Sequence, residues 1–368
     1  IAGDGLWTSD PAVNFVTVTE DPAKKKPDPE RLAGRVARAF LGVRLDCAQC
    51  HNHPFEKWKR QDFQGLAAFF GQVDNNLTGI HDNPKLHYEA LDRKTGEPVT
   101  FEPSVPFRPE LLPAEGSLRQ RLAAWVTHPQ NPNLGRATVN RIWAVMSGRP
   151  LVEPLDDLST SGDPPPYLTI LADDFVAHDY DLRRLIRLIA ATEAFQHDSR
   201  ADHELTAAHD KVWAAFPGTP LRPEQVAGAI VQAASVTTIN AESSPLSRLI
   251  RAGDVSNFVK AYGDTGEDEF RERSCTITQT LLVMNGDLVK ERTKDSIFNA
   301  STRIGWQSPD DRAAVENAFL TVYTRRPSER EAAHFEERLR GTKGNEREQR
   351  MEDLFWALVN STEFKWNH

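Results

Sequence analysis

The chain has 368 residues, of which 39% are hydrophobic and 26% are charged, a composition typical of a folded globular protein rather than a disordered one. Its formal net charge of −9 at pH 7 excludes the broad basic face that general nucleic-acid binding or docking on anionic lipid needs. It has no run of about 18 apolar residues, so no membrane span is predicted, and the length allows two or three domains of about 100–200 residues each.

The first 30 residues are predicted to form an extended arm. Glycine and proline recur throughout this stretch, and both interrupt regular structure. Because the chain starts at Ile1 and not at a methionine, we interpret its start as a processed or trimmed end of a longer product.

Two helices are predicted on either side of a pair of cysteines. The first runs from Pro29 to Asp46, and proline suits its first turn. The second runs from Arg60 to Val73. Both assignments rest on apolar residues at helical spacing, namely Leu32, Val36, Phe40 and Val43 in the first helix and Phe63, Leu66, Ala67 and Phe70 in the second.

A β-hairpin is predicted next, with stretches 87–91 and 98–101 flanking a turn at 94–97 that contains a glycine. The proline-rich segment 103–113 indicates a linker, which divides the chain into parts 1–113 and 114–368. From residue 117 onward the pattern is almost entirely helical. The predicted fold class is therefore mainly α, an irregular multi-helix assembly with a small β-hairpin element between two helical parts.

The segment Cys47-Ala48-Gln49-Cys50-His51 has the C-x-x-C-H pattern of c-type haem attachment. Two thiols at this spacing add across the two vinyl groups on one edge of a porphyrin. The imidazole of the next residue then reaches the iron from one face. The sequence thus predicts one covalent haem c, held through Cys47 and Cys50, with His51 as the proximal iron ligand.

Two other interpretations of this segment stay open. The first is a pair of buried or redox-active thiols beside an ordinary histidine. The second is zinc bound by Cys47, Cys50, His51 and His53, which form the ligand set of a structural zinc site. All four lie within seven residues, whereas such zinc sites usually draw on two separated pairs, so haem is favoured. The remaining cysteine, Cys275, is interpreted as a reduced buried thiol.

The residues around the cysteines resemble those of the planctomycete cytochrome C domain family, in segments 40–55 and 65–70 and at Trp58. The later part of the chain resembles the planctomycete surface domain that accompanies it in that family. The matching stretches there are 121–125, 139–143, 156–157, 174–176, 180–182 and 360–364. The resemblance implies that 1–113 is the C-terminal part of a cytochrome-c-like haem-binding domain and 114–368 a helical surface domain. It also implies an exported protein that begins with a secretion signal and further N-terminal sequence.

A second axial ligand would favour electron transfer, whereas an open iron site would favour small-molecule chemistry. His87 is the first candidate for the distal ligand and His81 the second, because both follow the second predicted helix in a stretch able to fold back. His53 is a further candidate, for a neighbouring haem or for a structural role. For His81 and His87 the alternative is an ordinary solvated loop histidine.

Trp58 and Phe69 are candidates to cover the haem edge, with ordinary core packing as the alternative. Arg141 is a candidate partner for a haem propionate, with an ion pair to Asp156 or Asp157 as the alternative.

The sequence as a whole predicts an extracytoplasmic c-type haem protein, periplasmic or on the cell surface, that transfers electrons within a larger assembly. Its partners would be a redox protein or other haem subunits. Two rival functions remain: a haem enzyme with an open distal site acting on a small molecule or polysaccharide, and a structural or surface module with a Cys/His zinc site.

Overall fold

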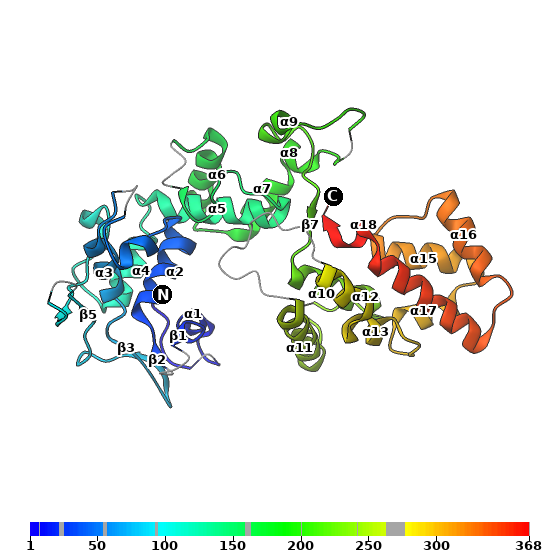
Figure 1. Cartoon of the computed structure of the whole chain (residues 1–368), viewed down its shortest axis with the longest axis horizontal. Helices are drawn as coiled ribbons and strands as arrows, with labels where there is room; N and C mark the ends of the chain where they lie inside the picture. Colours follow the sequence, from blue (N-terminus) through cyan, green and yellow to red (C-terminus); the bar gives the residue numbers. More distant parts are fainter. Residues whose placement is uncertain are drawn as a thin grey trace. The chain divides into compact units, whose positions relative to one another are not determined.

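The computed structural model describes residues 1–6, 8–21, 26–53, 57–92, 95–158, 163–199, 201–240, 242–262 and 277–367. The predicted buried thiol of Cys275 lies outside these residues. The chain divides into two compact units, Ile1–Phe195 and Gln196–His368, which run from blue to green and from green to red in Figure 1. Both are mainly α-helical, so the predicted fold class is confirmed.

Helix α2 (Pro29–Val36) begins where the sequence predicted, with the Asp28 side chain accepting hydrogen bonds from the backbone N–H groups of Glu30 and Arg31. It continues as a wider π-helical turn over Ala37–Leu41. The helix then stops at Gly42, whose φ of +60° is left-handed. The predicted extension to Asp46 is therefore wrong, and a separate 3-10 turn (Asp46–Gln49) carries the first cysteine.

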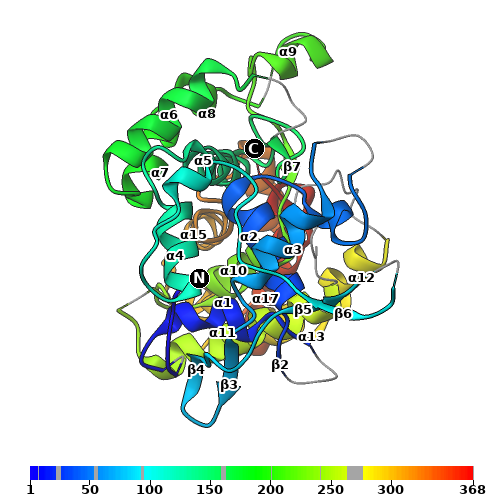
Figure 2. The same cartoon turned by 90° about the vertical axis from the view of Figure 1, so that its left-hand side faces the viewer.

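Helices α3 (Arg60–Ala68) and α4 (Leu118–Val126) share one hydrophobic core with α2. Figure 2 shows α2 and α3 side by side. Helix α3 ends before the predicted Val73, because Val73 is the first residue of a strand. The predicted domain boundary near residue 113 stays a prediction. In space, residues on both sides of it contribute to this core.

Two antiparallel hairpins lie between α3 and α4. The predicted one is confirmed as β5 (Glu89–Leu91) paired with β6 (Pro98–Thr100), with Glu89 opposite Thr100. Sequence reasoning missed the other, β3 (Val73–Asn76) with β4 (Gly79–Asp82).

The first 30 residues are more structured than the predicted extended arm. They form a 3-10 turn (Pro11–Val13), helix α1 (Asn14–Thr17) and the short strand pair β1 (Glu20–Asp21) and β2 (Lys26–Pro27). The side chains of Val13 and Val16 are buried in the same core as α2, so this segment is part of the unit.

The first unit is completed by α5 (Pro132–Ser147), α6 (Pro166–Ala177) and α7 (Leu182–Ala190), and α5 packs against α6. A 3-10 turn (Pro109–Leu111) precedes α4, and the short helix α8 (Glu193–Gln196) follows α7.

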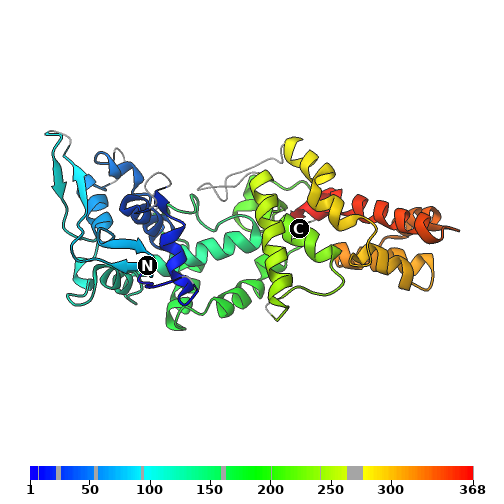
Figure 3. The ribbon, with the colours of Figure 1, turned by 90° about the horizontal axis from the view of Figure 1, so that it is seen from below.

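The second unit contains two hydrophobic clusters built mainly by helices. In Figure 3 the red helix α17 lies alongside the orange helices α15 and α16. The elements of this unit are α9 (Ala207–Lys211), β7 (Thr219–Pro220), α10 (Pro223–Ala234), α11 (Pro245–Tyr262), α12 (Ile277–Asn285), α13 (Asp287–Thr293), α14 (Ala300–Gln307), α15 (Asp311–Tyr323), α16 (Glu329–Leu339), α17 (Gly344–Asn360), α18 (Thr362–Lys365) and β8 (Trp366–Asn367). Within the described ranges, no helix has the length and apolar character needed to cross a membrane.

Candidate functional site

The turn that carries the cysteines exposes both thiols. Cys47 and Cys50 are solvent-exposed and unpaired, whereas Ala48 between them is completely buried and its N–H donates to the Leu45 carbonyl at 2.8 Å. Residues three apart eclipse one another in a 3-10 turn, and Cys50 caps this one. This spacing is expected to place the two exposed side chains on the same side of the turn.

The start of the turn is held by an ion pair. The Arg38 Nε donates to Asp46 Oδ2 at 2.8 Å, and both side chains are partly buried. Asp46 also lies close against α2, since a Cβ placed on Gly34 would come within 3.0 Å of Asp46 Oδ1. A glycine at this position lets the turn approach the helix.

The end of the turn is held by a polar network beneath it. The Gln49 side-chain amide donates to Glu30 Oε2 at 2.5 Å, and the Gln64 amide donates to the Gln49 carbonyl at 2.9 Å. The Tyr88 hydroxyl donates to Glu30 Oε1 at 2.7 Å and also contacts the side-chain oxygen of Gln64. Burial, followed by the bond to Glu30, raises the pKa of Tyr88, so this hydroxyl stays a donor.

Sequence reasoning did not identify this network. One signal was present, because Gln64 is a polar residue between Phe63 and Leu66 in the apolar stretch of α3, and it is only 1% exposed. A buried side-chain amide is nearly always hydrogen bonded, so its position pointed to a polar partner inside the core.

His51 is exposed, and its Nδ1 lies 2.7 Å from the backbone carbonyl oxygen of Asn52. A carbonyl only accepts, so Nδ1 carries the proton in this contact and Nε2 keeps its lone pair. No described residue bonds to Nε2. Asn52 is itself tied to α3, because its Oδ1 accepts from the Arg60 N–H at 3.1 Å. A histidine oriented through one ring nitrogen and free at the other is the arrangement that metal-ligating histidines use.

These donors fit the requirements of a haem c. Two exposed free thiols lie three residues apart at the 3-10 turn, and an imidazole nitrogen is available on the residue after the second. Over the described ranges, no group of three or more His, Cys, Asp or Glu side chains is arranged to hold a metal ion. Cys47, Cys50, His51 and His53 therefore do not form a ready-made zinc site.

The two aromatic residues predicted to cover a haem lie inside the protein core. Trp58 is 4% exposed and Phe69 is fully buried, and both belong to the hydrophobic cluster that includes Ala48. The indole Nε1 of Trp58 has no hydrogen-bond partner among the described residues. The Trp58 carbonyl accepts from the N–H of His53 at 2.8 Å. Contact of either aromatic ring with a haem stays a prediction.

The two candidate distal histidines differ in their surroundings. His81 lies on β4 with both ring nitrogens engaged, Nε2 at 2.9 Å from Thr78 Oγ1 and Nδ1 at 3.1 Å from Asp4 Oδ1. His87 is exposed, and no described residue bonds to its ring. Of the two, only His87 would ligate iron without first giving up a hydrogen bond.

The structure pairs Asp156 with Arg44, a residue that sequence reasoning did not consider. Arg44 Nη2 lies 2.8 Å from Asp156 Oδ1, and this ion pair ties the segment before the cysteines to the loop after α5. Arg141 lies half-buried on α5. Its predicted contact with a propionate stays a prediction.

Comparison with known families adds two matches. Residues 1–75 are similar to the family PSCyt2, described as a protein of unknown function (DUF1549). Residues 118–252 are similar to the family PSD1, described as a protein of unknown function (DUF1553). By name these are the planctomycete cytochrome C and surface domain families. Searches among curated proteins and among solved structures found no match.

Proposed function

We propose that this chain is a c-type haem protein that transfers electrons outside the cytoplasm, within a larger assembly. The observation that carries the proposal is the joint exposure of Cys47 and Cys50 beside a His51 whose Nε2 bonds to no described residue. The similarity of residues 1–75 to a family named for cytochrome C supports it.

The chain's own residues can perform the attachment without an oxidant. Each thiol would add across one vinyl group, with sulfur bonding to one carbon and the thiol hydrogen passing to the other, so that no electrons are gained or lost. The Asn52 carbonyl fixes the His51 ring so that Nε2 is the ligating atom. The contacts of Asp46 and Gln49 hold the turn in place. Once bound, a haem supplies one-electron redox chemistry, tuned by its axial ligands and its exposure to solvent.

Covalent haem is attached outside the cytoplasm, so the proposal places the protein in the periplasm or at the cell surface. An exposed attachment turn would leave a haem edge accessible to a redox partner protein or to neighbouring haem subunits. We propose His87 as the distal ligand, because its ring has no bond to a described residue whereas both ring nitrogens of His81 are engaged.

The experiment is export of the chain, behind a secretion leader, in a host that matures c-type cytochromes. Intact mass under denaturing conditions and the visible spectrum are then measured. The proposal expects the mass of one added haem and a reduced α-band of c-type character. The double variant Cys47→Ser/Cys50→Ser should lose both, while Cys275→Ser, the matched control, should keep both.

Unmodified mass without a Soret band would overturn the haem proposal. If haem is attached, the spin state separates the two haem functions. A low-spin spectrum of six-coordinate iron supports electron transfer. A high-spin spectrum with carbon monoxide binding supports instead a haem enzyme with an open distal site.

A further inference from the structure

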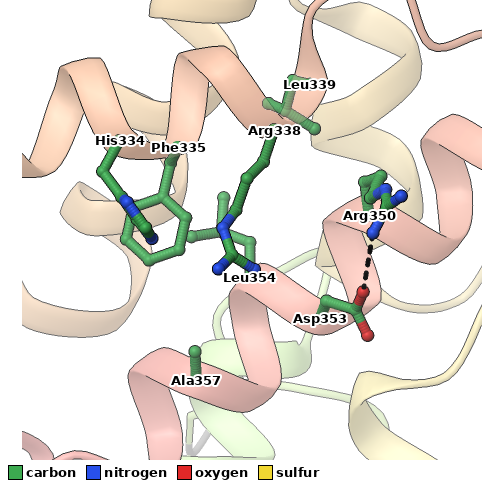
Figure 4. A pocket seen from close by; sticks show the side chains of 8 residues that line it. All are labelled: His334, Phe335, Arg338, Leu339, Arg350, Asp353, Leu354 and Ala357. Carbon is green, nitrogen blue, oxygen red and sulfur yellow. Dashed lines mark ion pairs between the residues drawn. The ribbon is translucent and has the colours of Figure 1, made fainter.

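The second unit contains a cavity between α16 and α17, of about 150 Å³. Figure 4 shows the side chains that line it. They are His334, Phe335, Arg338, Leu339, Arg350, Asp353, Leu354 and Ala357. Both family matches end before this cavity, and the haem proposal does not involve it.

The floor of the cavity is apolar and firmly packed. Leu339 and Leu354 are 1% and 2% exposed and belong to a hydrophobic core cluster. The ring of Phe335 packs edge-on against Phe319, with centroids 6.0 Å apart. Ala357 also lines the cavity, and its side chain is a single methyl group that leaves space unfilled. The volume of this cavity is about that needed by a benzene ring.

The rim of the cavity carries one uncompensated positive charge. Arg350 forms an exposed ion pair with Asp353, with Nη1 3.8 Å from Oδ2. Arg338 has no ion-pair or hydrogen-bond partner among the described residues, and in Figure 4 its guanidinium lies over Leu354. On the neighbouring helix α15, by contrast, Arg312 is paired with Glu329 and Glu336.

We propose that this cavity binds a small organic monocarboxylate with a compact apolar body, a class represented by benzoate. The ring or short chain would fill the space over Leu354 and Ala357. The carboxylate would take two parallel hydrogen bonds from the fork of Arg338. A neutral ligand would form no ion pair with Arg338. The second negative charge of a dianion would be repelled by the carboxylate of Asp353.

Binding is tested on the full chain by saturation-transfer NMR and calorimetry, with benzoate as the probe and benzamide as its neutral counterpart of the same shape. We expect saturable benzoate binding and a benzamide affinity lower by about ten-fold or more, because a charge-assisted pair is lost. Arg338→Gln should weaken benzoate by a similar factor. Arg340→Gln removes the same charge two residues away, outside the cavity lining, and should leave affinity unchanged.

Ala357→Leu provides an independent check, because it fills the cavity without touching any charge. It should abolish benzoate binding while the circular dichroism melt stays cooperative. The proposal is overturned by the absence of saturable benzoate binding, by equal affinity for benzamide, or by equal effects of the Arg338 and Arg340 substitutions.

Discussion

Gln49, which lies between Cys47 and Cys50 in the sequence, donates its side-chain amide to the Glu30 carboxylate at 2.5 Å. A residue inside the C-x-x-C spacing thus ties the turn to the first turn of α2. The other oxygen of Glu30 accepts from the Tyr88 hydroxyl, which comes from the segment before β5. Three separate parts of the chain therefore meet at one carboxylate beneath the exposed thiols.

Glu30→Ala should destabilise the protein by about 2–3 kcal/mol, because it removes a charged acceptor and leaves the Tyr88 hydroxyl and the Gln49 amide without their partner. Urea unfolding measures the free energy. Glu89→Ala is the control, because Glu89 is exposed and has no described partner, so its cost should stay within about 0.5 kcal/mol. An equal loss of unfolding free energy in the two variants would show that the network does not stabilise the fold.

Gly42→Ala should be more destabilising than Gly96→Ala. Both glycines have left-handed backbone, with φ of +60° and +74°, so each alanine costs about 1–2 kcal/mol of backbone strain. At Gly42 the new Cβ would also lie 3.0 Å from Leu158 Cδ1, whereas at Gly96 it meets nothing within 4 Å. The difference in unfolding free energy should therefore reach about 1 kcal/mol or more. A difference near zero would mean that Leu158 moves aside freely.

The end of α2 shows why helix boundaries were harder to predict than helix starts. Pro29 at the first turn and the apolar spacing located the start correctly. The helical spacing of apolar residues continues to Val43, which is buried although it lies beyond the end of the helix. An apolar residue just after a left-handed glycine packs back onto the same core, so periodicity alone does not reveal that the helix has ended.

The candidate site was predictable only where its chemistry is local in the sequence. Cys47, Cys50 and His51 are visible as a motif because covalent haem attachment fixes their spacing. Some of the residues in the supporting contacts come from far along the chain. Tyr88 is 58 residues from Glu30, and Asp156 is 112 residues from Arg44. Such pairs depend on tertiary packing, and neither composition nor periodicity encodes them.

His51→Ala should keep the thioether-linked haem and lose the low-spin spectrum, because the thiols remain while the proximal nitrogen is removed. His53→Ala is the control, since the bond from its backbone N–H to the Trp58 carbonyl survives the substitution. Intact mass and the reduced spectrum check both variants. Loss of the low-spin spectrum in the His53 variant instead would assign the proximal role to that residue.

Tyr88 should make the protein sensitive to alkali. Its pKa is raised in the folded state by burial and by the bond to Glu30, whereas in the unfolded chain it ionises near pH 10. Unfolding above about pH 10 therefore releases a proton, and stability falls as pH rises through this value. Tyr88→Phe should be less stable at pH 7 by about 1 kcal/mol but show a shallower decline above pH 10. Tyr167→Phe, at an exposed tyrosine, should leave the decline unchanged.

Glu331 should stabilise the folded state at neutral pH, and this contribution should be lost at low pH. Its pKa is lowered from 4.5 to about 2, chiefly by hydrogen bonds from the Arg325 guanidinium at 3.0 and 3.1 Å, and also by the N–H and hydroxyl of Ser328. As pH falls below 4.5 the unfolded state takes up the proton first, so this contribution is lost progressively between pH 4.5 and about 2.

Because the Glu331 side chain is 34% exposed, solvent screening limits the loss in Glu331→Gln to about 1 kcal/mol at pH 7. The variant should also have a flatter dependence of its urea midpoint on pH between 4.5 and 3. Glu337→Gln, at an exposed glutamate with no described partner, should retain the wild-type dependence. If Glu331→Gln kept the full acid sensitivity, the loss of stability would come from other carboxylates, such as Glu329 in the same helix, whose pKa is lowered by Arg312.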